Sequence, residues 1–169
     1  SIELSANPTA GAKIKLDDIE TINIKVDANA SYDLSAIAMT TAAKTTSLVL
    51  TGAGDFTVND ATAMNADIVS IDASGMTGAL NTADSFAANA LTSTAVTLIG
   101  GSGADTIVGG AAGDTLTGNG GADQFNVTPH ANKFTYDTVT DASNADKLFI
   151  TGVATDIATV QGTWAKVTL

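Results

Sequence analysis

The feature of this sequence that most constrains its fold is a repeat of nine residues between positions 100 and 126. Asp105, Asp114 and Asp123 are each preceded by a cluster of glycines. A spacing of nine residues matches neither one face of an α-helix nor a β-hairpin, but it is typical of the rungs of a solenoid. We therefore expect a chain that coils, with one short strand and one turn in each repeat.

The three copies of the repeat share one order of residue types. Glycine recurs in the first positions, aspartate is sixth, and a large apolar residue is eighth, namely Ile107, Leu116 and Phe125. Glycine permits positive φ and lets backbone carbonyls converge, while the aspartate adds charge beside them. The pattern predicts a site for a hard cation, with the eighth side chains stacked in the core.

Two other interpretations of the glycines fit the sequence less well than the solenoid. A phosphate-binding loop requires a following apolar helix, whereas here another glycine turn arrives nine residues later, and no Walker lysine is present. A flexible linker has a similar composition. The regular apolar residue in the eighth position argues against the linker, because a linker has no core to fill.

The copies resemble the repeats-in-toxin (RTX) nonapeptide, GGxGxDx-apolar-x, which is the calcium-binding β-roll unit of secreted bacterial proteins. The first copy matches the whole pattern, whereas the second has Ala112 for its third glycine and the third has Asn119 in its second position. In that β-roll two nonapeptides complete one turn, so alternate copies lie on the same edge. The resemblance implies that Asp105 and Asp123 face one calcium ion.

The implied calcium ligands are carboxylates in the sixth position and backbone carbonyls in the second and fourth positions. They are Gly101, Gly103, Asp105, Asn119, Gly121 and Asp123 on one edge, and Gly110, Ala112 and Asp114 on the opposite edge. Oxygen ligands of this kind suit calcium. Asp114 would need a partner eighteen residues away, near Val96 or Asn132. Neither neighbourhood is a good repeat, so we expect one well-formed site and one or two incomplete sites.

The residues before 99 follow a longer and less regular form of the same strand-and-turn repeat. We take one apolar residue in each of four rungs as equivalent: Val26, Leu50, Ile71 and Ile99. The intervals of 24, 21 and 28 residues suit a parallel β-solenoid with variable outward loops.

Three upstream segments stay open at this point. At 34–43 and 82–91 small helix formers are mixed with threonines, so that short helices and loop crossings fit about equally well. "GAGD" at 52–55 looks like a shortened calcium turn with Asp55 as its carboxylate, although a simple β-turn is the favoured interpretation.

The segment 137–153 resembles the stretch that follows RTX arrays, and we expect it to cap the open end of the stack. Asp137, Asp141 and Asp146 could hold a further ion there, although solvated loop acids are the favoured interpretation. The predicted fold class is all-β, a parallel β-solenoid in a single domain. Its parts are irregular rungs at 1–98, the RTX β-roll at 99–127 and a capping segment at 128–169, together expected to be a piece of a larger protein.

Charge and missing residue types exclude several function classes. Eighteen acids against seven lysines give a net charge of −11, which argues against nucleic acid or an anionic membrane as a partner and favours cations. No apolar run approaches a membrane span. There is no cysteine, His130 is the single histidine, and no Gly-x-Ser-x-Gly elbow or zinc-binding histidine pair occurs. We therefore expect a protein that is not an enzyme.

The rungs at 51–58 and 71–75, "TGAGDFTV" and "IDASG", stand ahead of the RTX units and look like those of bacterial surface-layer (S-layer) proteins. The resemblance implies a calcium-binding structural domain of a secreted cell-surface protein, in which calcium couples folding to self-association in a lattice. Type I secretion is the implied route of export. The alternatives are an RTX adhesin module and the noncatalytic calcium-binding tail of a secreted enzyme.

Overall fold

The computed structural model describes residues 2–4, 14–16, 20–32, 37–39, 46–58, 68–82, 95–110, 112–127, 136–150 and 159–162. These residues form β-strands that pair in parallel throughout, and they contain no helix. Within them, accordingly, no helix is long and apolar enough to cross a membrane. The all-β parallel solenoid predicted from the sequence is confirmed.

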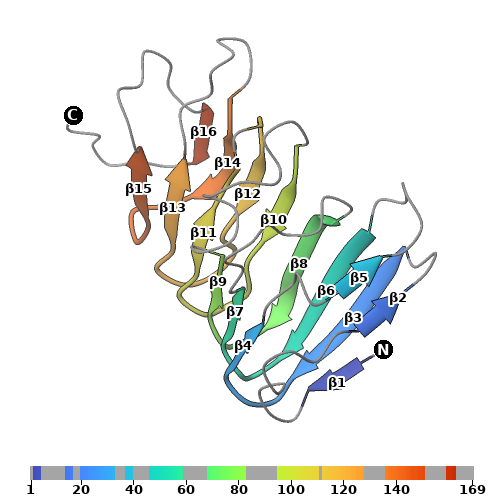
Figure 1. The fold of residues 1–169 in the computed structure, drawn as a ribbon. Coiled ribbons are helices and arrows are strands. Elements are labelled where there is room, and N and C mark those ends of the chain that lie inside the picture. Colours follow the sequence, from blue (N-terminus) through green and yellow to red (C-terminus); the bar gives the residue numbers. More distant parts are fainter. Residues whose placement is uncertain are drawn as a thin grey trace.

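Two sheets run along the length of the molecule, and in each of them the strands follow sequence order (Figure 1). The eight-stranded sheet contains β1 (Ile2–Leu4), β3 (Thr21–Val26), β6 (Thr46–Gly52), β8 (Ile68–Met76), β10 (Thr97–Ile99), β12 (Thr115–Thr117), β14 (Thr138–Ala142) and β16 (Thr159–Gly162). The six-stranded sheet contains β4 (Ala30–Tyr32), β7 (Phe56–Val58), β9 (Leu80–Asn81), β11 (Thr106–Val108), β13 (Gln124–Val127) and β15 (Lys147–Ile150). A separate pair is formed by β2 (Ile14–Leu16) and β5 (Ile37–Met39).

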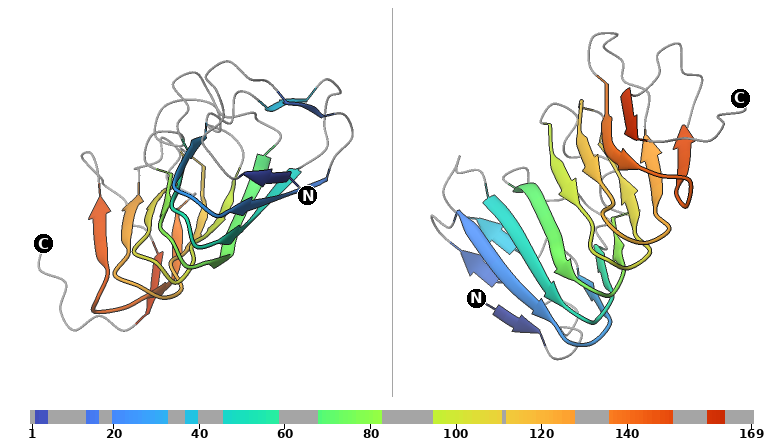
Figure 2. Two further views of the ribbon diagram at one scale, coloured as in Figure 1. Left: turned by 90° about the horizontal axis from the view of Figure 1, so that it is seen from below. Right: turned by 180° about the vertical axis from the view of Figure 1, so that it is seen from behind.

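The chain coils because successive strands alternate between the two sheets. From β10 to β16 every strand enters the sheet opposite to that of its predecessor, and the earlier pairs β3–β4, β6–β7 and β8–β9 do the same. The turns that join the sheets line up along the molecule (Figure 2). One circuit of the chain, here called a rung, therefore adds one strand to each sheet and stacks on the rung before it.

The core lies between the two sheets and is filled by alternate residues of each strand. In β3 the pattern is strictly alternating, with Ile22, Ile24 and Val26 buried and their neighbours exposed. Ile107, Leu116 and Phe125 are completely buried, as the eighth position of the repeat predicts. Because each strand of the roll is three or four residues long, only one or two side chains of each can point inward.

The predicted alignment of the upstream rungs is wrong in detail. Leu50 pairs with Ile24, not with Val26, and Ile71 pairs with Leu48 and Leu98, not with Leu50 and Ile99. The register of β6 against β8 shifts twice along the pairing. The predicted alignment is therefore off by one or two residues from the observed pairing. Part of the error comes from the register shifts, and part from taking Ile99 where the adjacent Leu98 is the equivalent residue.

The segment 34–43, left open between helix and loop, is a strand where the structure describes it, because Ile37–Met39 form β5 and pair with β2. Propensity had left helix and loop open there, and pairing with a parallel neighbour decides for a strand. The remainder of that segment, and 83–91 in the second possible helix, lie outside the described residues.

Candidate calcium sites

The turns of the roll lie on two opposite edges of the stack. The turn at 100–105 leads from β10 to β11 and the turn at 118–123 leads from β12 to β13, so both lie on what we call the first edge. The turn at 109–114 leads back from β11 to β12 and lies on the second edge. Pairing of Thr106 with Gln124 sets Asp105 beside Asp123. This placement agrees with the edge assignment made from the sequence.

Along the first edge the aspartates form a column linked by hydrogen bonds. Asp105 Oδ1 accepts from the Leu80 N–H at 2.7 Å, and Asp105 Oδ2 accepts from the Gly101 N–H at 2.7 Å. Asp123 Oδ1 accepts from the Asp105 N–H at 2.9 Å. Asp146 continues the column, since its Oδ1 accepts from the Asp123 N–H at 2.8 Å. Each carboxylate thus joins its own turn to the preceding rung.

The residues whose carbonyls were predicted as ligands lie in two adjacent turns of this edge. A Cβ atom on Gly121 would lie 2.1 Å from the Gly103 carbonyl oxygen, and Gly121 has a φ of 129°. Asn119 also has positive φ, at 65°, and its side-chain amide donates to the Gly100 carbonyl at 2.8 Å. The Gly101 carbonyl accepts from the Gly120 N–H at 3.1 Å. Only glycine lets the backbones of the two turns approach so closely.

Burial makes the first-edge carboxylates expensive to ionise. Asp105 and Asp123 are 1% and 2% exposed. Burial raises the pKa of Asp105 to about 6, against the lowering effect of the Leu80 and Gly101 N–H groups, and the charge of Asp123 raises it further. Burial also raises the pKa of Asp123, to which the negative charges of Asp146 and Asp141 add. A cation beside these oxygens would offset both the cost of burying the charged carboxylates and their repulsion by neighbouring negative charges.

The second edge is built around Asp114, which is also buried, at 1% exposure. Its Oδ1 accepts from the Val96 N–H at 2.9 Å, and its Oδ2 accepts from the Gly110 N–H at 2.5 Å. The neighbourhood of Val96 is therefore close to Asp114, as expected, but it contributes a hydrogen-bond donor and no carboxylate. Ala112 lies half-buried in the same turn. Asn132 lies outside the described residues.

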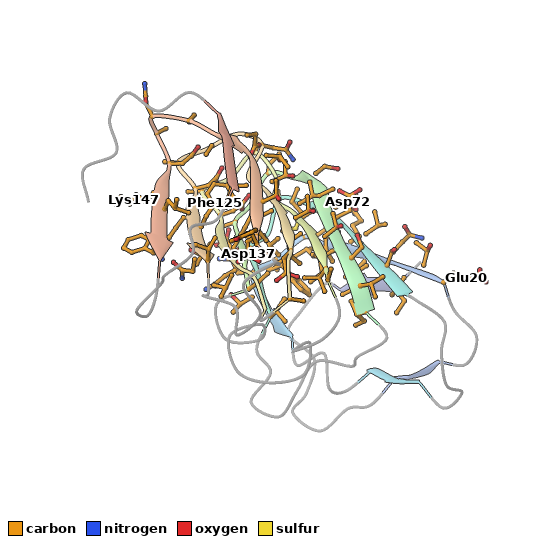
Figure 3. The ribbon with its side chains drawn as sticks, turned by 90° about the horizontal axis from the view of Figure 1, so that it is seen from above. Glu20, Asp72, Phe125, Asp137 and Lys147 are labelled. Atoms are coloured by element: carbon orange, nitrogen blue, oxygen red, sulfur yellow. The ribbon has the colours of Figure 1, made fainter. Side chains whose placement is uncertain are left out.

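The acid that sequence reasoning missed as a neighbour of Asp114 is Asp137. Its Oδ1 accepts from the Asp114 N–H at 3.0 Å, and it is 1% exposed. In Figure 3 it lies among the strands, whereas Glu20 and Lys147 lie at the periphery. The interpretation of Asp137 as a solvated loop acid is wrong, because stacking on Asp114 draws it into the edge.

Asp137, Asp141 and Asp146 do not form one site, because each extends a different part of the stack. Asp141 accepts from the N–H groups of Gly118 and Asn119 at 2.9 and 2.6 Å. Both Asp137 and Asp146 follow the acid on which they stack by 23 residues. That common offset was the signal in the sequence that could have found them.

Asp55 occupies an analogous turn in the upstream rungs. Its Oδ1 accepts from the Ala79 N–H at 2.8 Å, and its Oδ2 accepts from the side-chain amide of Asn29 at 2.9 Å. Asn29 Oδ1 in turn accepts from the Asp55 N–H at 3.0 Å. The turn at 52–55 is therefore stacked through its side chains on both neighbouring turns, and Asn29 is a second member that the sequence did not reveal.

The oxygens described on the first edge are carboxylates and backbone carbonyls, and those described on the second edge are the carboxylates of Asp114 and Asp137. Oxygens of this kind are the ligand chemistry of a hard cation. Within the described ranges, no three His, Cys, Asp or Glu side chains gather into a metal site. A cation would therefore draw on paired carboxylates and the carbonyls of the glycine turns, and the buried negative charge fits it. His130 lies outside the described residues.

Comparison with known families agrees with this geometry. The family model of the RTX calcium-binding nonapeptide repeat, which spans four copies, matches residues 97–127. In sequence and in fold, this segment is similar to an RTX β-roll. Since the RTX nonapeptide is a calcium-binding motif, the cation implied for the roll is Ca²⁺. No curated protein and no solved structure is significantly similar to the chain.

Proposed function

We propose that the chain is a calcium-binding structural domain of a secreted bacterial cell-surface protein of the S-layer type, in which calcium couples folding to assembly. The observation that carries the proposal is the column of buried carboxylates in the RTX β-roll, Asp105 and Asp123 at 1% and 2% exposure. Burying charge costs free energy unless an opposite charge compensates it. Binding of Ca²⁺ would therefore add directly to the stability of the fold.

An extracellular location is supported by the RTX repeats, which typically occur in secreted proteins. The proposed role is structural and non-catalytic, without insertion into a membrane. Self-association is supported by Phe149, which is 45% exposed on β15, the terminal strand of the six-stranded sheet. An exposed apolar side chain on a terminal strand favours contact with another chain.

The first experiment is a calcium titration followed by circular dichroism, with EDTA and magnesium as controls. We expect the β signal to increase with calcium and to fall again in EDTA, while magnesium at the same concentration has a much smaller effect. A spectrum that calcium leaves unchanged would contradict the coupling of binding to folding.

Assembly is tested separately, by sedimentation velocity and electron microscopy of the calcium-bound protein. Sheets or ordered oligomers at micromolar protein are expected for a lattice protein. A calcium-bound form that stays strictly monomeric would instead favour an RTX adhesin module or the calcium-binding tail of a secreted enzyme.

A further inference from the structure

The turns of the first edge carry their polar side chains at two different positions. In the upstream column, residues joined by hydrogen bonds from turn to turn are Asn29, Asp55 and Ala79. In the roll column, one residue further along each turn, they are Leu80, Asp105, Asp123 and Asp146. Leu80 is also the residue that pairs with Phe56 of the preceding rung. In the upstream turns, the polar residue (Asn29 or Asp55) comes first and an apolar residue follows it. In the turns of the roll, an alanine comes first and the aspartate follows it.

The two columns also point in opposite directions along the stack. Asp55 Oδ1 reaches forward to the N–H of Ala79 in the next rung, at 2.8 Å. Asp105 Oδ1 reaches back to the N–H of Leu80 in the preceding rung, at 2.7 Å. The consecutive N–H groups of Ala79 and Leu80 therefore donate to two different carboxylates, one in the preceding rung and one in the following rung. The turn at 76–80, which carries no acid of its own, is the joint between the columns.

The two columns differ in how much charge they bury. Asn29 is neutral and exposed, and Asp55 is only half-buried. Among the described residues, the buried acids are Asp105, Asp114, Asp123 and Asp137, all of which follow the joint. The described core up to and including the joint is apolar and contains Ile22, Ile24, Val26, Leu48, Leu50, Phe56, Val58, Ile68, Ile71, Ala73, Met76 and Leu80. Within the part of the chain that the structure describes, only the rungs after the joint have a buried charge that a cation must offset.

We propose that the rungs described between residues 20 and 82 fold without a cation and template the RTX β-roll, which assembles on them when calcium binds, with the turn at 76–80 and the Asp105 carboxylate as the joint. The template proposal rests on the calcium-coupled folding proposed above, and it adds the order in which the parts of the stack fold. A solenoid rung contacts only its neighbours, so a folded rung offers the next one a ready strand partner. Here β8 presents Ile71 to Leu98 of β10, and Leu80 presents its N–H to Asp105.

The test is hydrogen–deuterium exchange with mass spectrometry on the whole chain at neutral pH, in excess calcium and in EDTA. We expect the amides of β6 and β8 to stay protected in both conditions. Those of β11 and β13 should exchange at least about a hundredfold faster in EDTA, because local opening sets the exchange rate.

Each other outcome overturns the template in its own way. If β6 and β8 lose protection together with the roll, calcium-coupled folding stands but the template does not. If EDTA changes nothing anywhere, both the template and the proposed function fail. If β6 and β8 lose protection while the roll keeps it, the order of assembly is the reverse of the one proposed.

A pair of variants tests the effect of the buried charge at the joint, where Asp105→Asn also gives up the acceptor of the Gly101 N–H. Asp105→Asn keeps an oxygen that can accept from the Leu80 N–H but removes the buried charge, so in EDTA we expect β11 to exchange about tenfold more slowly than in the wild type. Asp55→Asn is the matched control and should leave the roll unchanged. The role of Asp105 would be contradicted if neither variant slowed the exchange of β11, or if both variants slowed it equally.

Discussion

At the scale of single residues, the sixth-position aspartates differ from the upstream acid in their distance from water. Asp105 is 1% exposed and accepts two backbone N–H groups, whereas Asp55 is half-buried and accepts from the side-chain amide of Asn29 in the preceding turn. Backbone N–H groups offset only part of the cost of burying a carboxylate. The remaining cost is what makes Asp105 a better partner for a cation.

The first prediction compares the same substitution at these two sites. Asp105→Asn should weaken calcium binding by about tenfold or more, about 1.4 kcal/mol, because one ligand charge is lost. Asp55→Asn is the control and should change the affinity by less than about twofold, since its carboxylate already has solvent and an amide partner. Isothermal titration calorimetry measures both. Equal losses would mean that the calcium site is not on the Asp105 turn.

The second prediction concerns two adjacent glycines of the third repeat. A Cβ on Gly121 would meet the Gly103 carbonyl at 2.1 Å in a backbone with φ of 129°, whereas a Cβ on Gly120 has its nearest neighbour, Ser102 Cα, at 3.7 Å. Gly121→Ala should therefore lower the free energy of unfolding by about 1–3 kcal/mol, with Gly120→Ala close to the wild type. Urea unfolding in excess calcium measures the difference, and similar midpoints for the two variants would contradict this stacking of the turns.

At the scale of elements, the strands of the roll are so short that each depends on one or two inward side chains. β12 has only Leu116 fully buried, between the half-buried Thr117 and the exposed Thr115. Leu116 pairs with Leu98 on one side and with Val139 on the other. Its side chain therefore holds three consecutive rungs of the eight-stranded sheet together.

The third prediction follows from that position. Leu116→Ala should cost about 2–5 kcal/mol of unfolding free energy, because it leaves a cavity in a thin core. Thr115→Ala, on the outward face of the same strand, should cost within about 0.5 kcal/mol. Thermal and urea unfolding in saturating calcium would measure both values. A large loss for Thr115→Ala would show that the outer face of the sheet is covered.

The sequence predicted best those elements whose period is constant. The nine-residue repeat fixes the inward positions of Ile107 and Phe125, because every turn has the same length and the strand is too short to slip. Upstream, the outward loops vary in length and β6 shifts register against β8, so apolar residues such as Leu98 and Ile99 cannot be ranked by pattern alone. Asp137 was misjudged because its burial depends on stacking over Asp114, a contact that lies outside the nine-residue period.

At the scale of the whole molecule, charge and core are distributed unevenly along one continuous stack. The net charge is −11, and the buried acids of the described residues all lie between 105 and 137. The apolar residues between the sheets nevertheless form one cluster from Ile22 to Ala142. Hydrophobic packing thus favours the coil along its whole length, while buried like charges oppose it in the roll until they are neutralised.

Protons can neutralise those charges as well as calcium, and the fourth prediction uses this. Burial raises the pKa of Asp105 to about 6 and also raises that of Asp123, so below about pH 6 the folded roll binds more protons than the unfolded chain. Stability in EDTA must then fall as the pH rises through this window, since the ionised form is the one that burial disfavours. We expect circular dichroism in EDTA to show more β structure at about pH 5 than at about pH 7.5, a difference that saturating calcium removes.

The same linkage requires calcium binding near pH 6 to release protons, because calcium favours the ionised carboxylates. Calorimetric titrations in two buffers of different ionisation enthalpy would measure the number released, and Asp105→Asn is the control that should reduce it. The effect should be smaller at about pH 7.5, where Asp105 is already ionised before calcium binds. A β signal in EDTA that increases with pH, together with no proton release at pH 6, would show that these carboxylates are not the groups through which calcium stabilises the roll.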